Sequence, residues 1–269
     1  MEKTLMFRRH FGLTHCPLGK QTKILWEDGQ LEKLNSRFNW LLESPGIGLL
    51  TGEPGVGKTA WIRQLTKKLN PHRYQVIYLA ETDFGRFDIY RQLATELGLE
   101  PTYRRAQLWR EIKEHITQLV ETKSILPVWI IDESHNLPLD FFKDFPAFLN
   151  FAFDSKDMMT VWFLGHSQLE NTLNRHPYAA LASRIQVKEK LEPVFEKQRF
   201  ISLLKQAFEE AGATQPLLSD PGIELIRMAS KGKPRIAGQI IQNALRLATE
   251  KKINHLPDDI VMEAIDIMK

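Results

Sequence analysis

Short apolar runs alternate with longer amphipathic segments up to residue 191. The apolar runs have the length of buried strands, and the segments between them carry apolar residues at helical spacing. We predict strands at Ile47–Thr51, Gln75–Ala80, Pro127–Asp132, Met159–Leu164 and Ile185–Val187, and helices at Lys58–Leu69, Phe87–Leu97, Ala106–Glu121 and Phe141–Phe153. Strands that alternate with helices imply crossover connections, and hence an α/β fold with a parallel five-stranded sheet flanked by helices on both faces.

After Leu191 the pattern is helical only. Helices are predicted at about Pro193–Ala211, Ser219–Ala229, Pro234–Lys251 and Pro257–Met268. Ser219 stands before Asp220-Pro221 as a capping residue, and Lys231-Gly232-Lys233-Pro234 reads as a helix-breaking turn. We therefore predict two domains: a nucleotide-binding α/β domain over residues 1–190, including an N-terminal extension at 1–45, and a small C-terminal helical lid over 191–269.

Composition and charge narrow the class of protein only slightly. The chain has 269 residues, 43% of them hydrophobic, and a net charge of +3 from 36 basic and 33 acidic residues. That charge permits an anionic partner without demanding one, so any argument for nucleic-acid binding has to rest on local clusters. The single cysteine, Cys16, excludes an internal disulfide and reads as a structural thiol. Without a long apolar run or a signal peptide, we expect a cytoplasmic protein with no membrane partner.

The strongest chemical signal is a glycine-rich loop between the first strand and the helix that follows it. Its glycines let backbone N–H groups turn toward phosphate, Lys58 would reach the β- and γ-phosphates, and the Thr59 hydroxyl would bind Mg²⁺. The first turn of the helix, with Ala60, adds the positive end of the helix dipole. We predict a site for ATP and Mg²⁺ at Gly52, Glu53, Pro54, Gly55, Val56, Gly57, Lys58, Thr59 and Ala60.

A second signal is the apolar strand that ends in Asp132-Glu133. We expect this strand to lie beside the strand that leads into the glycine-rich loop, which is called the P-loop below. There the Asp132 carboxylate would bind Mg²⁺ through water. Glu133 would then orient and deprotonate the water that attacks the γ-phosphate.

Three further sites are weaker candidates. His166 or Ser167, at the end of the fourth strand, is expected beside the γ-phosphate as a polar sensor, although Ser167 is equally well explained as a helix N-cap. Arg184, before the fifth strand, is either a surface arginine or an arginine finger for a neighbouring subunit's nucleotide. Arg235 opens a lid helix, from which it can fold back onto the phosphates.

In this order, the motifs resemble those of an AAA+ ATPase. More narrowly, the chain resembles the branch that holds the ExeA-type ATPases and the transposition helper ATPases of the TniB, TnsC and MuB kind. The local matches are Phe11-Gly12-Leu13, Cys16-Pro17-Leu18, Ile131-Asp132-Glu133-Ser134-His135-Asn136-Leu137, Leu164-Gly165-His166-Ser167-Gln168-Leu169 and Gly232-Lys233-Pro234-Arg235. The resemblance covers nearly the whole chain.

Two histidines stand out against this family pattern. His166 occupies a position where the family commonly has an amide, and Ser167 replaces a proline, so the identity of the sensor is open. His135 follows the acidic pair. We interpret it as a hydrogen-bonding neighbour rather than a metal ligand, because no second ligand stands at zinc-like spacing in the sequence.

The transposition helpers assemble as rings or helical filaments around duplex DNA and recruit a transposase. The resemblance places DNA contacts in the segment Glu81–Phe87 and at the start of the helix after Pro101. Arginines, a tyrosine and a hydroxyl there suit phosphate-backbone contacts. The alternative is a solvated helix start. The predicted contact residues are Arg86, Thr102, Tyr103, Arg104 and Arg105.

The resemblance thus implies a slow, assembly-coupled ATPase that oligomerises on duplex DNA and recruits or activates a transposase at the target, with a target-selection protein as a further candidate partner. The alternative is an ExeA-like ATPase that assists type II secretion. Secretion ATPases carry a membrane span and a wall-binding portion beyond the ATPase module. The sequence up to Lys269 holds neither of them after the lid, and we expect this difference to favour transposition. A third reading, an initiator or clamp-loader-like ATPase, is disfavoured because no DNA-reading domain follows the lid.

Overall fold

The computed structural model describes residues 2–82 and 85–268. Its internal contacts divide the chain into two compact units. The first, called here the sheet unit, comprises Gly29–Gly52 and Leu65–Leu191. The second, called the helical unit, comprises Met1–Asp28, Glu53–Gln64 and Glu192–Lys269. The division between Leu191 and Glu192 falls next to the domain boundary predicted from the sequence.

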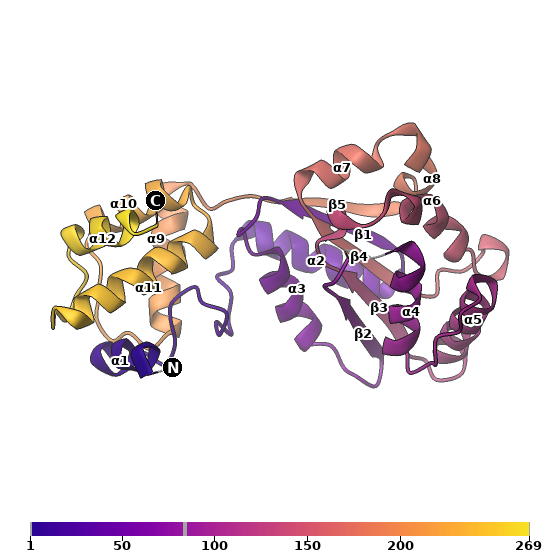
Figure 1. Cartoon of the computed structure of the whole chain (residues 1–269), viewed down its shortest axis with the longest axis horizontal. Coiled ribbons are helices and arrows are strands. Elements are labelled where there is room, and N and C mark those ends of the chain that lie inside the picture. The colour runs from indigo at the N-terminus through magenta and orange to yellow at the C-terminus, as the bar shows by residue number, and fades with distance from the viewer. Residues whose placement is uncertain (1, 83–84, 269) are drawn as a thin grey trace. The chain divides into compact units, whose positions relative to one another are not determined.

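The sheet unit is built on five parallel strands (Figure 1). They are β1 (Ile47–Gly52), β2 (Tyr74–Leu79), β3 (Leu126–Ile131), β4 (Thr160–Gly165) and β5 (Ile185–Leu191), in the spatial order β2-β3-β4-β1-β5. The predicted fold class is confirmed. One expectation was wrong: β3 does not lie beside the P-loop strand β1, because β4 pairs with both and separates them. Glycine at 48 makes room for this pairing, since a Cβ there would lie 2.6 Å from the Trp162 ring of β4.

Helices cover both faces of the sheet. On one face, Phe38 of α2 (Gly29–Glu43) stacks on Trp162 with the ring centroids 5.8 Å apart. On the other, α4 (Arg86–Glu96), α5 (Arg105–Glu121) and α6 (Leu139–Phe148) pack on the alternate strand residues, including Trp129 and Phe163. Two shorter helices, α7 (Ser167–Leu173) and α8 (Ala179–Ala182), precede β5. Side chains from successive strand positions therefore enter opposite layers, as the all-apolar strands predicted.

The helical unit has its own core. It contains α1 (Glu2–Phe11), α9 (Lys197–Glu210), α10 (Asp220–Ser230), α11 (Pro234–Glu250) and α12 (Asp258–Asp266). As predicted, Ser219 caps α10, its hydroxyl accepting a hydrogen bond from the Gly222 N–H at 2.9 Å. Lys231 and Gly232 take left-handed φ values of 52° and 70° at the predicted turn. A helix cannot continue through such a conformation.

The N-terminal segment packs with the lid helices rather than with the sheet to which the sequence assigned it. Phe7 and Leu13 are buried in the core of the helical unit. His15 contacts Glu210 at the end of α9, with 2.6 Å between Nε2 and Oε2. Burial raises the pKa of the Cys16 thiol to about 12, which agrees with its interpretation as a structural thiol rather than a nucleophile. The apolar residues of this segment account for the difference, because α11 and its neighbours bury them.

Several helix limits also differ from the sequence prediction. Helices α1 and α2 were not predicted. The helix expected to reach Phe153 ends at Phe148, and Ala152, Phe153 and Asp154 have left-handed φ values of 47°, 58° and 63°. The helix expected from Pro193 begins at Lys197, because the Glu196 carboxylate caps it by accepting from the N–H groups of Gln198 and Arg199. Among the described residues, no helix is both long and apolar enough to cross a bilayer.

Candidate nucleotide-binding and catalytic site

The P-loop follows directly from the carboxyl end of β1. Gly55 and Gly57 have φ values of 86° and 108°, in the region that side-chain-bearing residues rarely adopt. Val56 is buried, and helix α3 (Lys58–Lys67) begins at the predicted lysine. Lys58 is only 6% exposed, and its Nζ donates a hydrogen bond to the Glu53 carbonyl at 3.1 Å. Thr59 and Ala60 lie in the first turn of α3. A tight backbone-lined loop, a lysine folded over it and a helix N-terminus together fit a bound triphosphate.

The amino end of α11 lies on this loop. The Arg235 N–H donates to the Gly55 carbonyl at 3.2 Å, and Lys233 pairs with the Glu53 carboxylate at 2.5 Å. A Cβ on Gly55 would lie 3.1 Å from the Arg235 Cβ, so the glycine is needed for this close approach as well as for its φ. The structure thus places the first turn of α11, with Arg235, against the P-loop.

Asp132 lies immediately after β3 and is 3% exposed. Its Oδ2 accepts from the Tyr78 hydroxyl of β2 at 2.9 Å, and its Oδ1 accepts from the Glu133 N–H at 2.9 Å. Two donors hold the carboxylate as an acceptor in one orientation. Tyr78 was not predicted as a site residue. The sequence does hold a signal for it: Tyr78 alternates with the buried Ile77 and Leu79, and this alternation places its side chain on the opposite face of β2.

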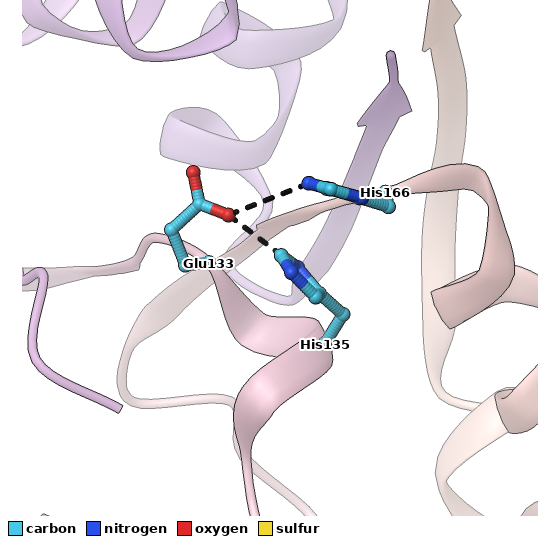
Figure 2. A group of neighbouring side chains, drawn as sticks. All are labelled: Glu133, His135 and His166. Atoms are coloured by element: carbon cyan, nitrogen blue, oxygen red, sulfur yellow. Dashed lines mark ion pairs between the residues drawn. The ribbon is translucent and has the colours of Figure 1, made fainter. Parts of the chain in front are cut away.

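Glu133 has a left-handed backbone, with φ 49° and ψ 36°. Its carbonyl accepts from the Thr82 hydroxyl at 3.1 Å, which holds the strained residue in place. Such conformations cost about 1–3 kcal/mol and concentrate at functional sites. One oxygen of the Glu133 carboxylate, Oε2, lies 3.5 Å from His135 Nδ1 and 3.7 Å from His166 Nε2 (Figure 2).

His166 lies at the carboxyl end of β4, between the ends of β1 and β3. It is the N-cap residue of α7, and no side chain caps that helix. Ser167 is the first helical residue, so its interpretation as an N-cap was wrong. The His135 and His166 rings lie 3.9 Å apart between centroids. Of the two sensor candidates, the structure therefore brings His166 to the Glu133 carboxylate, and His135 joins them.

Arg184 lies at the opposite edge of the sheet. It precedes Ile185, which pairs with Ile47 at the amino end of β1. Strand β1 has six residues, which puts about 17–20 Å between that end and the start of the P-loop. The Arg184 guanidinium pairs with Asp154 at 2.7 Å and donates to the Ala180 carbonyl at 3.2 Å.

Two of the predicted DNA-contact residues meet at Asp144 of α6. Arg86 and Arg105 each donate to Asp144 Oδ2 at 2.7 Å. Tyr103 is 86% exposed. Arg104, the N-cap residue of α5, is exposed and its side chain makes no capping bond. Thr102 differs from the expectation, since its hydroxyl oxygen is buried. Residues 83–84 of the predicted segment Glu81–Phe87 lie outside the described residues.

Residues 42–173, which hold the P-loop, Asp132, Glu133 and His166, match the family model for the AAA domain. This segment, about half of the chain, is an AAA domain. ATPases built on such a domain use ATP with Mg²⁺. The General secretion pathway protein A of Aeromonas hydrophila is 26% identical over 97% of this chain. The chain spans 48% of that protein's length, so the two correspond over about half of the longer protein.

Solved structures share the AAA+ fold. Cdc6p from Pyrobaculum aerophilum superposes with a TM-score of 0.72 at 18% identity, covering 92% of this chain and 69% of its own. The Aeropyrum pernix ORC1 protein, solved in complex with DNA, superposes with a TM-score of 0.71 at 16% identity, covering 93% of this chain and 68% of its own. At these identities the likeness shows the fold alone.

Proposed function

We propose that the chain is an ATP-dependent, DNA-binding regulator of DNA transposition that oligomerises on duplex DNA and recruits or activates a transposase at the target. The position of Arg184 carries the assembly part of this proposal. An arginine at the amino edge of the sheet cannot act on a nucleotide held at the carboxyl edge of the same sheet. A head-to-tail neighbour presents its amino edge to that nucleotide, and such interfaces generate rings or helical filaments.

The chemistry assigned to the site is hydrolysis of the γ-phosphoryl bond. The P-loop N–H groups and Lys58 hold the triphosphate, and Glu133 accepts a proton from the attacking water. Thr59 and, through water, Asp132 would hold Mg²⁺, which would supply positive charge to neutralise the phosphate oxygens. His166 contacts the γ-phosphate and so distinguishes ATP from ADP. Arg235 contacts the phosphates and so couples the position of α11 to the bound nucleotide.

The surface proposed for DNA contains Arg86, Tyr103, Arg104 and Arg105. We add Arg91 to the proposed surface, because its guanidinium lies 4.9 Å from the centre of the Tyr103 ring. The buried Thr102 hydroxyl is left out. Arginines that track a phosphate backbone bind without reading sequence. Asp144 holds two of them together and offsets part of their charge, so we expect binding that is moderate in affinity and strongly dependent on salt.

The proposal is tested by the ATPase rate per subunit, measured against protein concentration with and without duplex DNA. We expect a cooperative rise with concentration, and DNA should move its midpoint to lower concentration. Lys58→Ala should abolish nucleotide binding, whereas Glu133→Gln should bind ATP and fail to hydrolyse it. A rate per subunit that does not change with concentration or DNA would contradict assembly-coupled hydrolysis, and turnover by Glu133→Gln would reject Glu133 as the base.

A second candidate, an ATPase that assists secretion, is favoured by the match to General secretion pathway protein A over 97% of this chain. Both candidates use the same nucleotide chemistry, so only the partner separates them. Assembly that requires ATP but ignores duplex DNA would favour the secretion role. A transposase gene beside the gene for this chain would favour transposition.

A further inference from the structure

We propose that Glu133, His135 and His166 form a binding site for a divalent transition-metal cation of the zinc type, separate from the Mg²⁺ site, and that the bound ion inhibits ATP hydrolysis. In the part of the chain that the structure describes, this is the one group of three such side chains arranged to hold a metal ion. The three ligand atoms lie within 4.8 Å of one another. Figure 2 shows both imidazole rings directed at the same carboxylate oxygen.

The distances suit a tetrahedral ion. Zinc takes imidazole nitrogen and carboxylate oxygen at about 2.0–2.2 Å, which places neighbouring tetrahedral ligands roughly 3.3–3.5 Å apart. Glu133 Oε2 lies 3.5 Å from His135 Nδ1 and 3.7 Å from His166 Nε2. Two of the three edges therefore need a change of at most a few tenths of an ångström, which small side-chain rotations supply.

The backbone holds the three ligands in place. The short helix Ser134–Asn136, which carries His135, is anchored by the Ser134 hydroxyl, which donates to the Ile131 carbonyl at 2.6 Å. The left-handed Glu133 is held by Asp132 and Thr82, as described above. The end of β4 lies against this helix, since a Cβ on Gly165 would be in van der Waals contact with the His135 backbone nitrogen at 3.4 Å. The site therefore needs little reorganisation to bind an ion.

The donor set selects the type of ion. Two imidazoles and one carboxylate suit zinc and its transition-metal neighbours, whereas Mg²⁺ prefers oxygen ligands. Three protein ligands leave a fourth position for water. The side chains of Glu133, His135 and His166 are 47%, 21% and 35% exposed, so an ion and its water can reach them from solvent. The sequence has no second ligand at zinc-like spacing from His135, because the second histidine comes from another strand end.

Inhibition follows from the proposed role of Glu133, and this part rests on the proposed function. A carboxylate oxygen that ligates a cation no longer accepts a proton from water. His166 is withdrawn from the γ-phosphate at the same time. The Mg²⁺ ligands Thr59 and Asp132 are not used by the second ion, so ATP binding should persist while turnover falls.

Metal binding is tested without nucleotide, by calorimetry with Zn²⁺ and by the visible absorption of Co²⁺ as a spectroscopic substitute. We expect one ion per chain and a tetrahedral cobalt spectrum. His135→Ala and His166→Ala should each weaken binding at least about tenfold, whereas the control His72→Ala, at an exposed histidine elsewhere, should not. Circular dichroism melting of the metal-free variants checks their folding, and His135→Cys, which restores a ligand, should recover binding. The site is overturned if the wild-type chain binds no stoichiometric ion. It is also overturned if His135→Ala and His166→Ala both retain binding, as the control His72→Ala should.

Inhibition is tested separately, as ATPase activity titrated with Zn²⁺ at saturating Mg²⁺ and ATP. Each protein is compared with its own zinc-free rate. We expect Zn²⁺ to lower the wild-type rate, and at least about tenfold more Zn²⁺ to be needed for the same effect in His135→Ala. Bound zinc that leaves the rate unchanged overturns the inhibition. Hydrolysis by Glu133→Gln would reject the proposed base, yet the binding measurement would still decide the metal site, so the two failures are distinguishable.

Discussion

Arg184 offers the sharpest test of an active site shared between two subunits. Its position excludes action on the nucleotide of its own subunit and leaves action on the nucleotide of a neighbouring subunit. An arginine side chain reaches about 7 Å from its Cα. The carboxyl edge of the same sheet lies about 17–20 Å away along β1. Arg184 can therefore serve a nucleotide only in another subunit, and to do so it must leave Asp154, with which it pairs at 2.7 Å.

Arg184→Ala should lower the catalytic rate of the assembled protein by about 10³–10⁵-fold, the usual contribution of an arginine finger. The decisive assay mixes two inactive variants, Arg184→Ala and Glu133→Gln, in equal amounts. At about a quarter of the head-to-tail interfaces, a subunit with intact Glu133 meets a neighbour with intact Arg184. The mixture should therefore recover a substantial fraction of the wild-type rate.

Arg175→Ala serves as the matched control, since it removes an exposed arginine of the sheet unit that has no assigned role. Its rate should stay near that of the wild type. Subunit exchange between the two inactive variants is verified by fluorescence energy transfer. A mixture that exchanges freely but is no more active than either variant alone would refute the action of Arg184 across an interface.

Three further outcomes are expected. Replacing Arg104 and Arg105 together by alanine should weaken DNA binding and lower the salt slope by about 0.9 for each lost phosphate contact, as measured by fluorescence anisotropy; an unchanged slope removes this surface from consideration. Gly232→Ala should lower the unfolding free energy, measured in urea, clearly more than Gly12→Ala. Both glycines have left-handed φ, which costs alanine about 1–2 kcal/mol, but only at 232 would the new Cβ also lie 2.5 Å from a carbonyl oxygen. Equal losses in the two variants would contradict this packing. The raised pKa of Cys16 keeps its thiol protonated at pH 8, so a thiol reagent should label the native protein slowly and the unfolded protein fast. The stability that the protonated thiol contributes should be lost as pH rises from 9 toward 12, because these are the ordinary and the raised pKa values of the thiol.

The sheet and the P-loop were predictable because their signals are local. Strands buried on both faces are apolar throughout, and glycines at 55 and 57 are required by the backbone itself. The caps of the lid helices, such as Ser219, are local as well. Strand order is not a local property: nothing near Asp132 indicates that β4 lies between its strand and the P-loop strand.

The remainder of the candidate site arises from tertiary contacts. His135 and His166 are far apart in the sequence and meet because β3 and β4 end at one edge of the sheet. The left-handed backbone of Glu133 is unusual for a glutamate, and its neighbours Asp132 and Thr82 sustain it. The packing of the N-terminal segment on the lid was hidden because Phe7 and Leu13 show no periodic pattern that identifies their partner.

The central claim is that ATP controls assembly on DNA, and electron microscopy tests it most directly. The wild-type chain is imaged with a non-hydrolysable ATP analogue, with and without duplex DNA, beside Lys58→Ala. We expect rings or filaments that require the analogue, are promoted by duplex DNA and are absent in the variant. Particles that stay monomeric with both analogue and DNA, or that assemble equally in Lys58→Ala, would contradict the account.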